Sequence, residues 1–477
     1  MAEKKTSDGK KTTSSKSKST AKKSTGKSST KTNVKRVVKA AKKVDTSKSF
    51  KDNKDALTDV VVATATSASR AKNKKQKKFF TVLTVILVIA LVAIAVYGYF
   101  NGWFNTVIYG ENGYVNGGQV NSETYDAAVI KEQELSIHFL ELGNKYVGDC
   151  VYIKAGETDI LIDAGSRQSS AETITNYINQ YVTDNKLEYV IATHAHQDHI
   201  AGFVGTQKAK GIFETYVIDT IIDFALTNQN PTTDKGANTL YGNYIEKRNL
   251  AVSKGANRYS AADCFNNAND ASSVYKLTDN IELEILYNYY YEHTTSDENN
   301  YSVCLMINQK IDENKTNHYF FTGDLEKEGE EKMVEYYDRA DTPNLPQCVL
   351  YKAGHHGSKT SSSPALLAKL KPEYVCICTC AGTSEYTPAN ENQFPTQQFV
   401  DNVAVYTDKV YVTTQVDFYC DKGWSSKGTV KSMNGNIVFA CANDKITMFF
   451  SNNDLKLKDT DWFKDKRVCP EAWKDEQ

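Results

Sequence analysis

The chain has 477 residues, of which 40% are hydrophobic and 24% charged, and this length is unusual for a single domain. The formal net charge of −1 hides a division, because residues 1–78 hold 24 Lys and Arg against 6 Asp and Glu, a net charge of +18, and the rest carries −19. This asymmetry argues against one uniform environment for the whole chain. None of the ten cysteines forms a CxxC pair, which argues against a zinc ribbon.

Residues 1–78 are dominated by Lys, Ser and Thr, as in the stretch KSKSTAKKSTGKSSTK. A segment of this composition buries too little apolar surface to offset the conformational entropy that it would lose on ordering. The sequence therefore predicts a disordered basic tail.

Residues 79–100 form an apolar run without a charged residue over 22 positions. About 20 apolar residues cross the hydrocarbon core of a bilayer as a helix, so we expect one transmembrane helix. The basic stretch KNKKQKK precedes this run, and basic flanks stay in the cytoplasm. A cleaved signal peptide fits less well, because the run is long and no small-residue cleavage site follows. The predicted topology is a single-pass protein of the cell membrane, with a cytoplasmic N-terminus and an extracellular C-terminal part.

The remaining chain is predicted to contain a linker at 101–134, one domain at 135–450 and a C-terminal extension at 451–477. Within the domain, short β-rich runs alternate with helical ones, which is typical of a layered α/β fold. Predicted strands occupy 135–142, 150–156, 158–165, 187–196, 281–290, 301–307, 318–324, 348–356, 409–414, 435–440 and 445–450. Predicted helices occupy 170–182, 240–252, 325–337 and 363–370.

Three cysteines alternate in the run VCICTC as Cys376, Cys378 and Cys380. In a strand they would share one face, and we interpret them as small buried hydrophobic residues. An extracellular domain also allows disulfides, but the sequence does not define their pairing.

The stretch THAHQDHIAG at 193–202 places His194, His196, Asp198 and His199 within six positions, in a chain with only eight histidines. A single histidine is more often a packed core or surface group, but this cluster favours metal binding. The first two histidines share one face of an extended segment and could hold one ion. Asp198 and His199 are expected on the turn after that strand, and this carboxylate and third imidazole could hold a second ion. Zinc is the metal most expected with these ligands, and iron or manganese also fit.

THAHQDHIAG resembles the HxHxDH signature of the metallo-β-lactamase superfamily. The segments ILIDAG, FFTGD and LYKAGHHGSKTS follow in the family's order, and the resemblance covers about 135–450. It implies an αββα sandwich with two divalent ions. It also implies a structural role for Asp163 behind the site, a metal-bridging carboxylate at Asp324, and further ligands at His355 and His356. ELGNKYVGDCVYIKAG and NNYSVCLMI make the sequence most similar to the extracellular domain of late-competence DNA-uptake proteins.

The sequence departs from the family pattern in one ligand position. Many members place another histidine before the Gly-Asp motif, where this chain has NNYS. Asn299, Asn300, His293 or water could fill the position, or the doubled His355–His356 pair could serve both ions. The competence proteins also carry many membrane helices, whereas one is predicted here, so their transport role does not carry over. The histidines interpreted as structural or incidental are His138, His293 and His318.

The resemblance implies a hydrolase in which Asp198 and Asp324 orient the nucleophile between two metal ions. Phosphodiesters are the favoured substrates. A domain with a net charge of −19 is poorly suited to a long polyanion, so we expect small or cell-wall phosphodiesters and no specific recognition of nucleic acid. An extracellular DNase of the competence type is one alternative. A non-catalytic binding module stabilised by metal is another, from a different class.

Three polar residues are candidates for contacts with the substrate: Ser358, Lys359 and Asn300. Ser358 and Lys359 directly follow the paired histidines and could reach a phosphate. The stretch GSKT could equally be a turn that leads into a helix capped by Ser362 or Ser363.

Overall fold

The computed structural model describes residues 78–79, 81–84, 122–383, 389–416 and 430–474. The chain divides into two compact units, 1–111 and 112–477. The predicted tail, apart from Lys78, and most of the predicted span at 79–100 lie outside the described residues. Among the residues that are described, no helix combines the length and the apolar character needed to cross a membrane.

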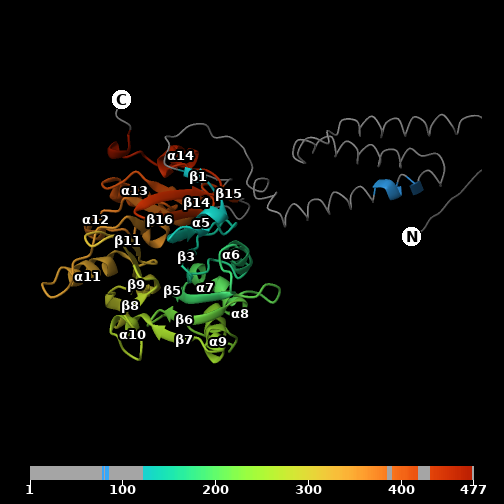
Figure 1. Cartoon of the computed structure of the whole chain (residues 1–477), viewed down its shortest axis with the longest axis horizontal. Coiled ribbons are helices and arrows are strands. Elements are labelled where there is room, and N and C mark those ends of the chain that lie inside the picture. The colour runs from blue at the N-terminus through green and yellow to red at the C-terminus, as the bar shows by residue number, and fades with distance from the viewer. Residues whose placement is uncertain (1–77, 80, 85–121, 384–388, 417–429, 475–477) are drawn as a thin grey trace, which may run out of the picture. The chain divides into compact units, whose positions relative to one another are not determined.

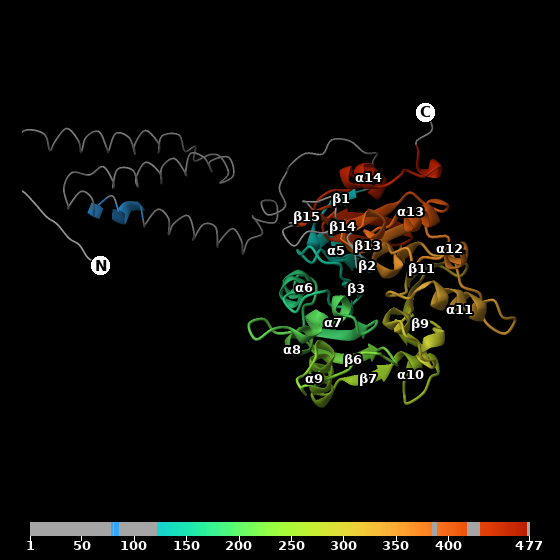
Figure 2. The ribbon, with the colours of Figure 1, turned by 180° about the vertical axis from the view of Figure 1, so that it is seen from behind.

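Two β-sheets form the centre of the second unit (Figures 1 and 2). In the described part of the chain, the first sheet has nine strands, in the spatial order β1 (Ser122–Thr124), β17 (Lys445–Phe450), β16 (Ile437–Ala442), β2 (Leu135–Phe139), β3 (Val151–Ala155), β4 (Thr158–Ile162), β5 (Lys186–Ala192), β6 (Val217–Asp223) and β7 (Asn257–Ser260). The second has eight, in the order β15 (Val430–Ser432), β14 (Val410–Val416), β13 (Tyr374–Ala381), β12 (Leu350–Lys352), β11 (Thr316–Phe321), β10 (Leu305–Lys310), β9 (Ile281–Ile285) and β8 (Val274–Lys276).

Helices cover the outer faces of both sheets, and Figures 1 and 2 show α6 to α9 beside the first sheet and α11 to α13 beside the second. The α-helices are α5 (Ala127–Lys131), α6 (Ser170–Ile178), α7 (Gln197–Val204), α8 (Ile212–Thr215), α9 (Leu240–Ser253), α10 (Ala261–Phe265), α11 (Lys327–Tyr337), α12 (Pro364–Leu370), α13 (Gln397–Ala404) and α14 (Asp461–Lys466). Short 3-10 helices are η1 (Tyr289–Tyr291), η2 (Glu298–Tyr301), η3 (Gly354–Gly357), η4 (Asn390–Asn392), η5 (Leu457–Asp459) and η6 (Glu471–Trp473). The predicted mixed α/β fold is confirmed.

Parallel pairing brings the sequence motifs to one edge of each sheet. Strands β4, β5 and β6 run parallel, so Asp163 after β4 and His194 after β5 follow neighbouring carboxyl ends. Strands β11, β12 and β13 are also parallel, and Asp324 and His355 follow the ends of β11 and β12 in the same way. Loops after parallel strands are the usual position of a site in α/β proteins.

Two clusters of buried apolar side chains stabilise the unit. The larger contains residues of both sheets, and the smaller lies between the second sheet and α11 to α13. In β13 the side chains alternate, since Cys376 and Cys378 belong to the larger cluster and Val375 and Ile377 to the smaller. All three cysteines of this strand are buried, as predicted. The nine described cysteines are free thiols, and Cys420 lies outside the described residues.

The packed unit includes segments on both sides of the predicted domain at 135–450. Strand β1 pairs in parallel with β17, and Ile130 of α5 is buried in the larger cluster. Beyond β17, Phe463 of α14 and Trp473 of η6 are buried in the smaller cluster. The C-terminal extension therefore contributes to the core.

The structure differs from the sequence prediction at two motif segments. The strand predicted at 301–307 begins only at Leu305, because the preceding residues form η2 and a connector. The polar NNYS stretch at 299–302 makes hydrogen bonds to neighbouring residues and is not part of a sheet. Asp198 and His199, expected on a turn, lie in the first turn of α7.

Candidate metal centre

The HAHQDH motif spans the junction between β5 and α7. His196 is the N-cap of α7 with extended backbone (φ −69°, ψ 151°), so the two preceding residues still continue the strand direction while Asp198 and His199 enter the helix. The backbone of α7 approaches the loop after β4 closely, with Ala164 N donating to His199 O at 2.7 Å. Gly202 permits this approach, since a Cβ there would lie 2.2 Å from Ala164 O.

His199 lies between two buried carboxylates. Its Nδ1 is 2.7 Å from Asp163 Oδ2, and its Nε2 is 3.0 Å from Asp324 Oδ2. Asp163 is itself fixed, because it accepts hydrogen bonds from the backbone N–H and the hydroxyl of Thr193, both at 2.8 Å. One ring nitrogen of His199 is thus held from outside, and the other points into the cluster.

His356 repeats this arrangement from the second sheet. Its Nδ1 hydrogen-bonds the carbonyl oxygen of Cys378 at 3.1 Å and lies 3.1 Å from Asp149 Oδ1. Its Nε2 is 3.2 Å from both Asp198 Oδ2 and Asp324 Oδ2. His355 does so more loosely, with Nδ1 3.5 Å from Glu326 Oε1 and Nε2 4.0 Å from Asp324 Oδ2. Metal-binding histidines commonly have one nitrogen held by a carboxylate in this way.

His194 and His196 form a second group of donor atoms. His194 Nε2 lies 3.0 Å from His196 Nδ1, close to the separation of about 3.3 Å expected for two nitrogens on one tetrahedral zinc ion. His194 Nδ1 is 3.2 Å from Thr193 Oγ1 and 3.4 Å from Ser302 Oγ, so its inner nitrogen is again Nε2. The rings of His194 and His199 are 4.1 Å apart, which joins this pair to the rest of the cluster.

Protonation is favoured at His199 and His356, whereas burial and the neighbouring histidines lower the pKa of His194 well below its ordinary value. Burial opposes a charged imidazole, but Asp324 and Asp163 outweigh burial and raise the pKa of His199 well above its ordinary value. Asp324 and Asp149 do the same for His356. Burial would raise the pKa of Asp324, but His199 and His356 hold it well below its ordinary value. Protons on these histidines can be exchanged for a metal ion, because ligands bind metal in the deprotonated form.

The donor set fits a divalent ion. Asp198, His199, Asp324 and His356 each offer a ligand atom within 4.8 Å of the others. Asp324 Oδ1 is buried and accepts no hydrogen bond within the described residues, although a buried carboxylate oxygen normally has a partner. His194 and His196 provide two imidazoles for another ion, and a third ligand for that ion is not defined by the contacts of the described residues.

The backbone is strained at three positions of the candidate metal centre. Asp163, His355 and His356 have positive φ angles of 58°, 45° and 54°, a region in which residues other than glycine cost about 1–3 kcal/mol each. Such strain persists where the surrounding structure holds it, and it is concentrated at functional sites. At His355 and His356 of η3, this backbone conformation directs both side chains towards Asp324.

Two residues of the centre were not identified from the sequence. Asp149 and Lys352 form a buried ion pair, and Lys352 Nζ also lies 3.7 Å from Asp324 Oδ1. Burial would lower the pKa of Lys352, but Asp149 and Asp324 raise it above its ordinary value. A charged residue inside the apolar segment CVLYKAG, together with the acid in GDC, was the available signal.

The predicted substrate contacts are made within the protein. Ser358 is buried, with its Oγ 3.0 Å from Thr360 Oγ1, and Lys359 Nζ donates to Asn392 Oδ1 at 2.7 Å. Asn300 Oδ1 accepts from the backbone N–H of Glu326 at 3.3 Å. The alternative of a turn and a helix cap is observed, because Ser363 caps α12 by accepting from Leu366 N.

The three histidines interpreted as structural or incidental make contacts outside the cluster. Buried His138 hydrogen-bonds Tyr177 Oη and Ser136 Oγ, both at 2.8 Å. His318 Nδ1 lies 2.7 Å from Asn308 Oδ1. His293 is exposed and stacks on Tyr289 at 3.8 Å, so no contact of the described residues supports it as the missing ligand.

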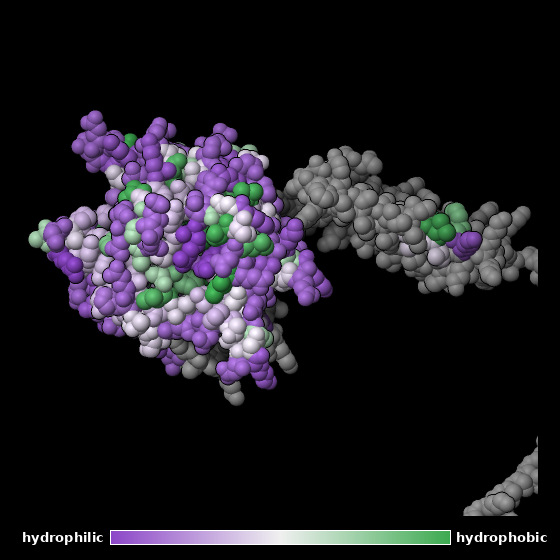
Figure 3. All heavy atoms as spheres, turned by 90° about the horizontal axis from the view of Figure 1, so that it is seen from below, coloured by the Kyte–Doolittle hydropathy of each residue, from purple (hydrophilic) through white to green (hydrophobic). Residues whose placement is uncertain are grey.

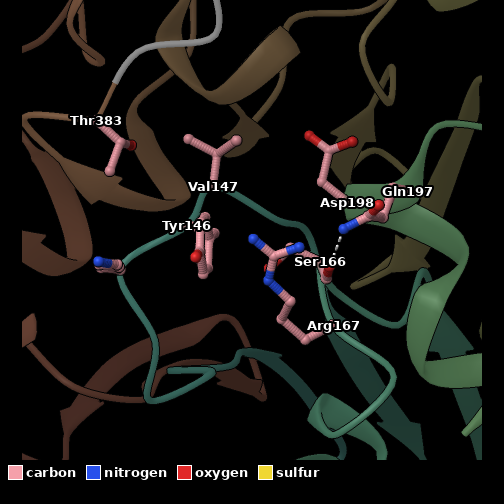
Figure 4. A pocket seen from close by; sticks show the side chains of 8 residues that line it. Tyr146, Val147, Ser166, Arg167, Gln197, Asp198 and Thr383 are labelled. Atoms are coloured by element: carbon pink, nitrogen blue, oxygen red, sulfur yellow. Dashed lines mark hydrogen bonds between the residues drawn. The ribbon is translucent and has the colours of Figure 1, made fainter. Parts of the chain in front are cut away.

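A pocket of about 280 Å³ opens beside Asp198 (Figure 4). It lies between the loop after β2 and the loop after β4, which are tied together because Gly165 N donates to Asp149 O at 2.8 Å. The side chain of Asp198 is 22% exposed and reaches this pocket, whereas Asp324 is only 2% exposed. The lining residues are Lys145, Tyr146, Val147, Ser166, Arg167, Gln197, Asp198 and Thr383.

Part of the chain is similar to a known family of proteins. Residues 143–216, which include the HAHQDH motif, match the family model of the metallo-beta-lactamase superfamily. ComE operon protein 3 of Bacillus subtilis (strain 168) is 41% identical over 59 residues, a match that spans 12% of this chain and 7% of that protein.

Similar solved structures include metallo-beta-lactamase fold proteins. YhfI from Bacillus subtilis is 10% identical and aligns over 61% of this chain and 98% of its own, with a TM-score of 0.32. The class B3 di-zinc metallo-beta-lactamase LRA-12 from an Alaskan soil metagenome is 15% identical over 43% of this chain and 69% of its own, with a TM-score of 0.23. The metallo-beta-lactamase MIM-1 from Novosphingobium pentaromativorans is 12% identical over 45% of this chain and 74% of its own, with a TM-score of 0.25.

Proposed function

We propose that this chain, which carries a metallo-β-lactamase superfamily domain, is a membrane-anchored extracellular hydrolase that uses two divalent ions, most simply zinc, to cleave small or cell-wall phosphodiesters. The observation that supports it best is the orientation of the histidines. His199 has its outer nitrogen on Asp163, and His356 has its outer nitrogen on the carbonyl of Cys378 and beside Asp149. Both inner nitrogens lie within 3.2 Å of Asp324 Oδ2. Two histidines with a purely structural role would not be expected to direct their second ring nitrogens at the same carboxylate.

The proposed ligands divide into two groups around Asp324. His194 Nε2 and His196 Nδ1 would hold the first ion, and Asp198, His199 Nε2 and His356 Nε2 the second. The ions would supply Lewis acidity to the scissile phosphoryl group and to the attacking water. Asp324 Oδ2 lies 3.0 Å from His199 Nε2 and 3.2 Å from His356 Nε2, both in the second group. The backbone N–H of Asp324 donates to Ser302 Oγ at 3.0 Å, which fixes the position of this residue.

Asp198 and Asp324 have different surroundings and, we infer, different roles. Asp324 is enclosed, so it serves to hold the ions. Asp198 is partly exposed to the pocket, and it is the carboxylate best placed to orient water next to a substrate. Hydrolysis of a diester breaks one P–O bond, adds water across it, and leaves a phosphomonoester and an alcohol.

Pocket size and net charge favour a small substrate. A pocket of about 280 Å³ lies just below the usual range of volumes for small-molecule sites. The chain beyond residue 78 carries −19, and the face in Figure 3 is mostly hydrophilic with apolar groups near its centre. A long polyanion would need a row of cations, whereas a small diester needs only the metal centre and a few donors.

The proposed location outside the cell follows from the basic stretch before the apolar run at 79–100. Protease added to intact cells should digest the part after residue 100 and spare the tail, as detected with tags at both ends of the chain. Digestion of the tail instead would reverse the topology and remove the argument for an extracellular substrate.

The test of function combines metal content with activity. The purified chain should contain about two transition-metal ions and should hydrolyse a bis-aryl phosphodiester, and the variants Asp198→Asn and Asp324→Asn should lose about 100-fold or more of kcat. Asp184→Asn, at an exposed position, is the matched control and should retain full activity. Stoichiometric metal with no turnover on any phosphodiester would identify a binding module instead of an enzyme.

A further inference from the structure

The pocket beside Asp198 contains an arginine whose charged group has no acceptor among the residues that the structure describes. The guanidinium of Arg167 lies 3.4 Å from the centre of the Tyr146 ring (Figure 4). Within the described residues it donates no hydrogen bond and forms no ion pair with a carboxylate. Its five N–H donors are therefore available on a side chain that stacking already holds in place.

Of the other four described arginines, three have acceptors within the protein, whereas Arg339, like Arg167, has none among the described residues. Arg248 and Arg258 pair with buried Asp223 at 2.7 Å and 2.5 Å, and Arg467 donates to backbone carbonyls. Arg339 also stacks on a tyrosine, Tyr336, at 4.9 Å, but it does not line the pocket. In a part of the chain that carries −19, an arginine without a carboxylate beside a candidate metal centre calls for an external anion.

The pocket wall around Arg167 is built to receive an anion. Lys145 lines the same pocket, so the lining includes two cationic side chains and one carboxylate, Asp198. Gln197 Nε2 donates to Ser166 O at 3.0 Å. This hydrogen bond joins the start of α7 to the loop that carries Arg167. Arginine held as a planar fork is the side chain best suited to bind two oxygens of one phosphate.

We propose that Arg167, positioned by Tyr146, binds a second phosphate of the substrate while the scissile diester lies at the metal centre. The inference rests on the proposed function, since it assumes that the diester lies next to Asp198, which belongs to both the cluster and the pocket. The substrate class is thus a small phosphodiester that carries another phosphate on the neighbouring unit. Arg167 determines specificity, and Tyr146 is a positioning residue.

Two chromogenic esters test this class directly, using the metal-loaded full-length chain. One is the p-nitrophenyl ester of thymidine 5′-phosphate, and the other is the same ester with a 3′-phosphate. In both, water cleaves the same P–O bond and releases p-nitrophenol. The wild type should prefer the 3′-phosphorylated ester in kcat/KM by about tenfold or more, as expected for charge-assisted hydrogen bonds.

The preference should depend on Arg167 and on the ring beneath it. Arg167→Gln should bring the ratio of the two kcat/KM values close to one, and Arg167→Lys should retain part of it. Tyr146→Ala should reduce the ratio, and Tyr146→Phe should restore it, because only the ring is needed for stacking. Arg339→Gln is the matched control, since it removes one charge from another stacked arginine, and it should keep the wild-type ratio.

A binding measurement separates this inference from the proposed function. Calorimetry should show tighter binding of thymidine 3′,5′-bisphosphate than of thymidine 5′-monophosphate to the wild type, and an equal affinity for both in Arg167→Gln. Equal ratios or equal binding preferences in wild type and Arg167→Gln would overturn the phosphate subsite. If neither ester is hydrolysed but the Arg167-dependent preference in binding persists, the subsite stands and the hydrolase proposal fails.

Discussion

The Nδ1 atom of His199 and the Oδ2 atom of Asp163 are 2.7 Å apart, and both residues are buried. This contact determines which nitrogen of His199 faces the cluster. Asp163→Asn should weaken metal binding by about 10- to 100-fold, as is typical when the partner of a ligand histidine is lost. Competition with a chromogenic chelator measures this affinity, and Asp184→Asn, an exposed acid, controls for the loss of one charge. Unchanged affinity would exclude His199 as a ligand oriented by Asp163.

The motif residues could be predicted because each follows the end of a strand. Asp163, His194, Asp324 and His355 come directly after or near apolar runs in the sequence, and parallel pairing of β4 with β5 and of β11 with β12 brings those runs to common edges. The spacing of the HAHQDH cluster indicated His194, whereas Asp163, Asp324 and His355 were implied by the resemblance of their motifs to the family pattern. The ligand assignment itself remains a prediction until metal is measured.

The supporting residues could not be predicted from local patterns. Asp149 and Lys352 are 203 positions apart and meet only because the two sheets pack together. Arg167 follows the Asp163 motif by four positions, but the sequence does not show that its guanidinium lies over Tyr146 from another loop. The expected substrate contacts at Ser358 and Lys359 were placed by adjacency to His356, whereas the chain turns Ser358 inward and pairs Lys359 with Asn392.

The buried ion pair of Asp149 with Lys352 should be a major determinant of stability. Asp149→Asn would leave the Lys352 ammonium buried beside Asp324, and breaking a buried pair in this way costs about 3–5 kcal/mol. The double variant Asp149→Asn with Lys352→Met should be less destabilised than the sum of the single variants, because neither charge is left unpaired. Urea unfolding of all four proteins gives the interaction energy, and strict additivity would show that the pair is not coupled.

His138 should give the fold a defined response to acid. Burial, with a smaller contribution from Lys154, lowers the pKa of His138 from its ordinary value of 6.5 to about 3. The folded state therefore binds fewer protons than the unfolded state between these values, so this stabilisation is complete above pH 6.5 and is lost as the pH falls towards 3.

The variant His138→Gln can keep hydrogen bonds to Tyr177 and Ser136 but does not titrate. Below pH 6.5 the wild type should lose up to about 1.4 kcal/mol more per pH unit than this variant. Unfolding free energies at pH 7.5, 6.5 and 5.5 test the difference, with exposed His293→Gln as the control for loss of a surface histidine. Parallel curves for the wild type and His138→Gln would contradict the assignment.

The domain should prefer small diesters to long duplex DNA, although 59 residues of the chain are 41% identical to ComE operon protein 3. The chain beyond residue 78 carries −19, and screening at physiological salt acts over only about 8 Å. Two divalent ions would add positive charge at the centre, which Asp198, Asp324 and the carboxylates behind the histidines partly offset. Lys145 and Arg167 line a pocket of about 280 Å³. This pocket accommodates one further phosphate but does not provide the row of cations that a duplex needs.

When plasmid DNA and the 3′-phosphorylated thymidine ester are offered together, the ester should be cleaved first at physiological salt, and added DNA should inhibit little. Efficient plasmid cleavage at that salt, with slow turnover of the ester, would instead establish a nuclease and locate its DNA contacts outside this pocket.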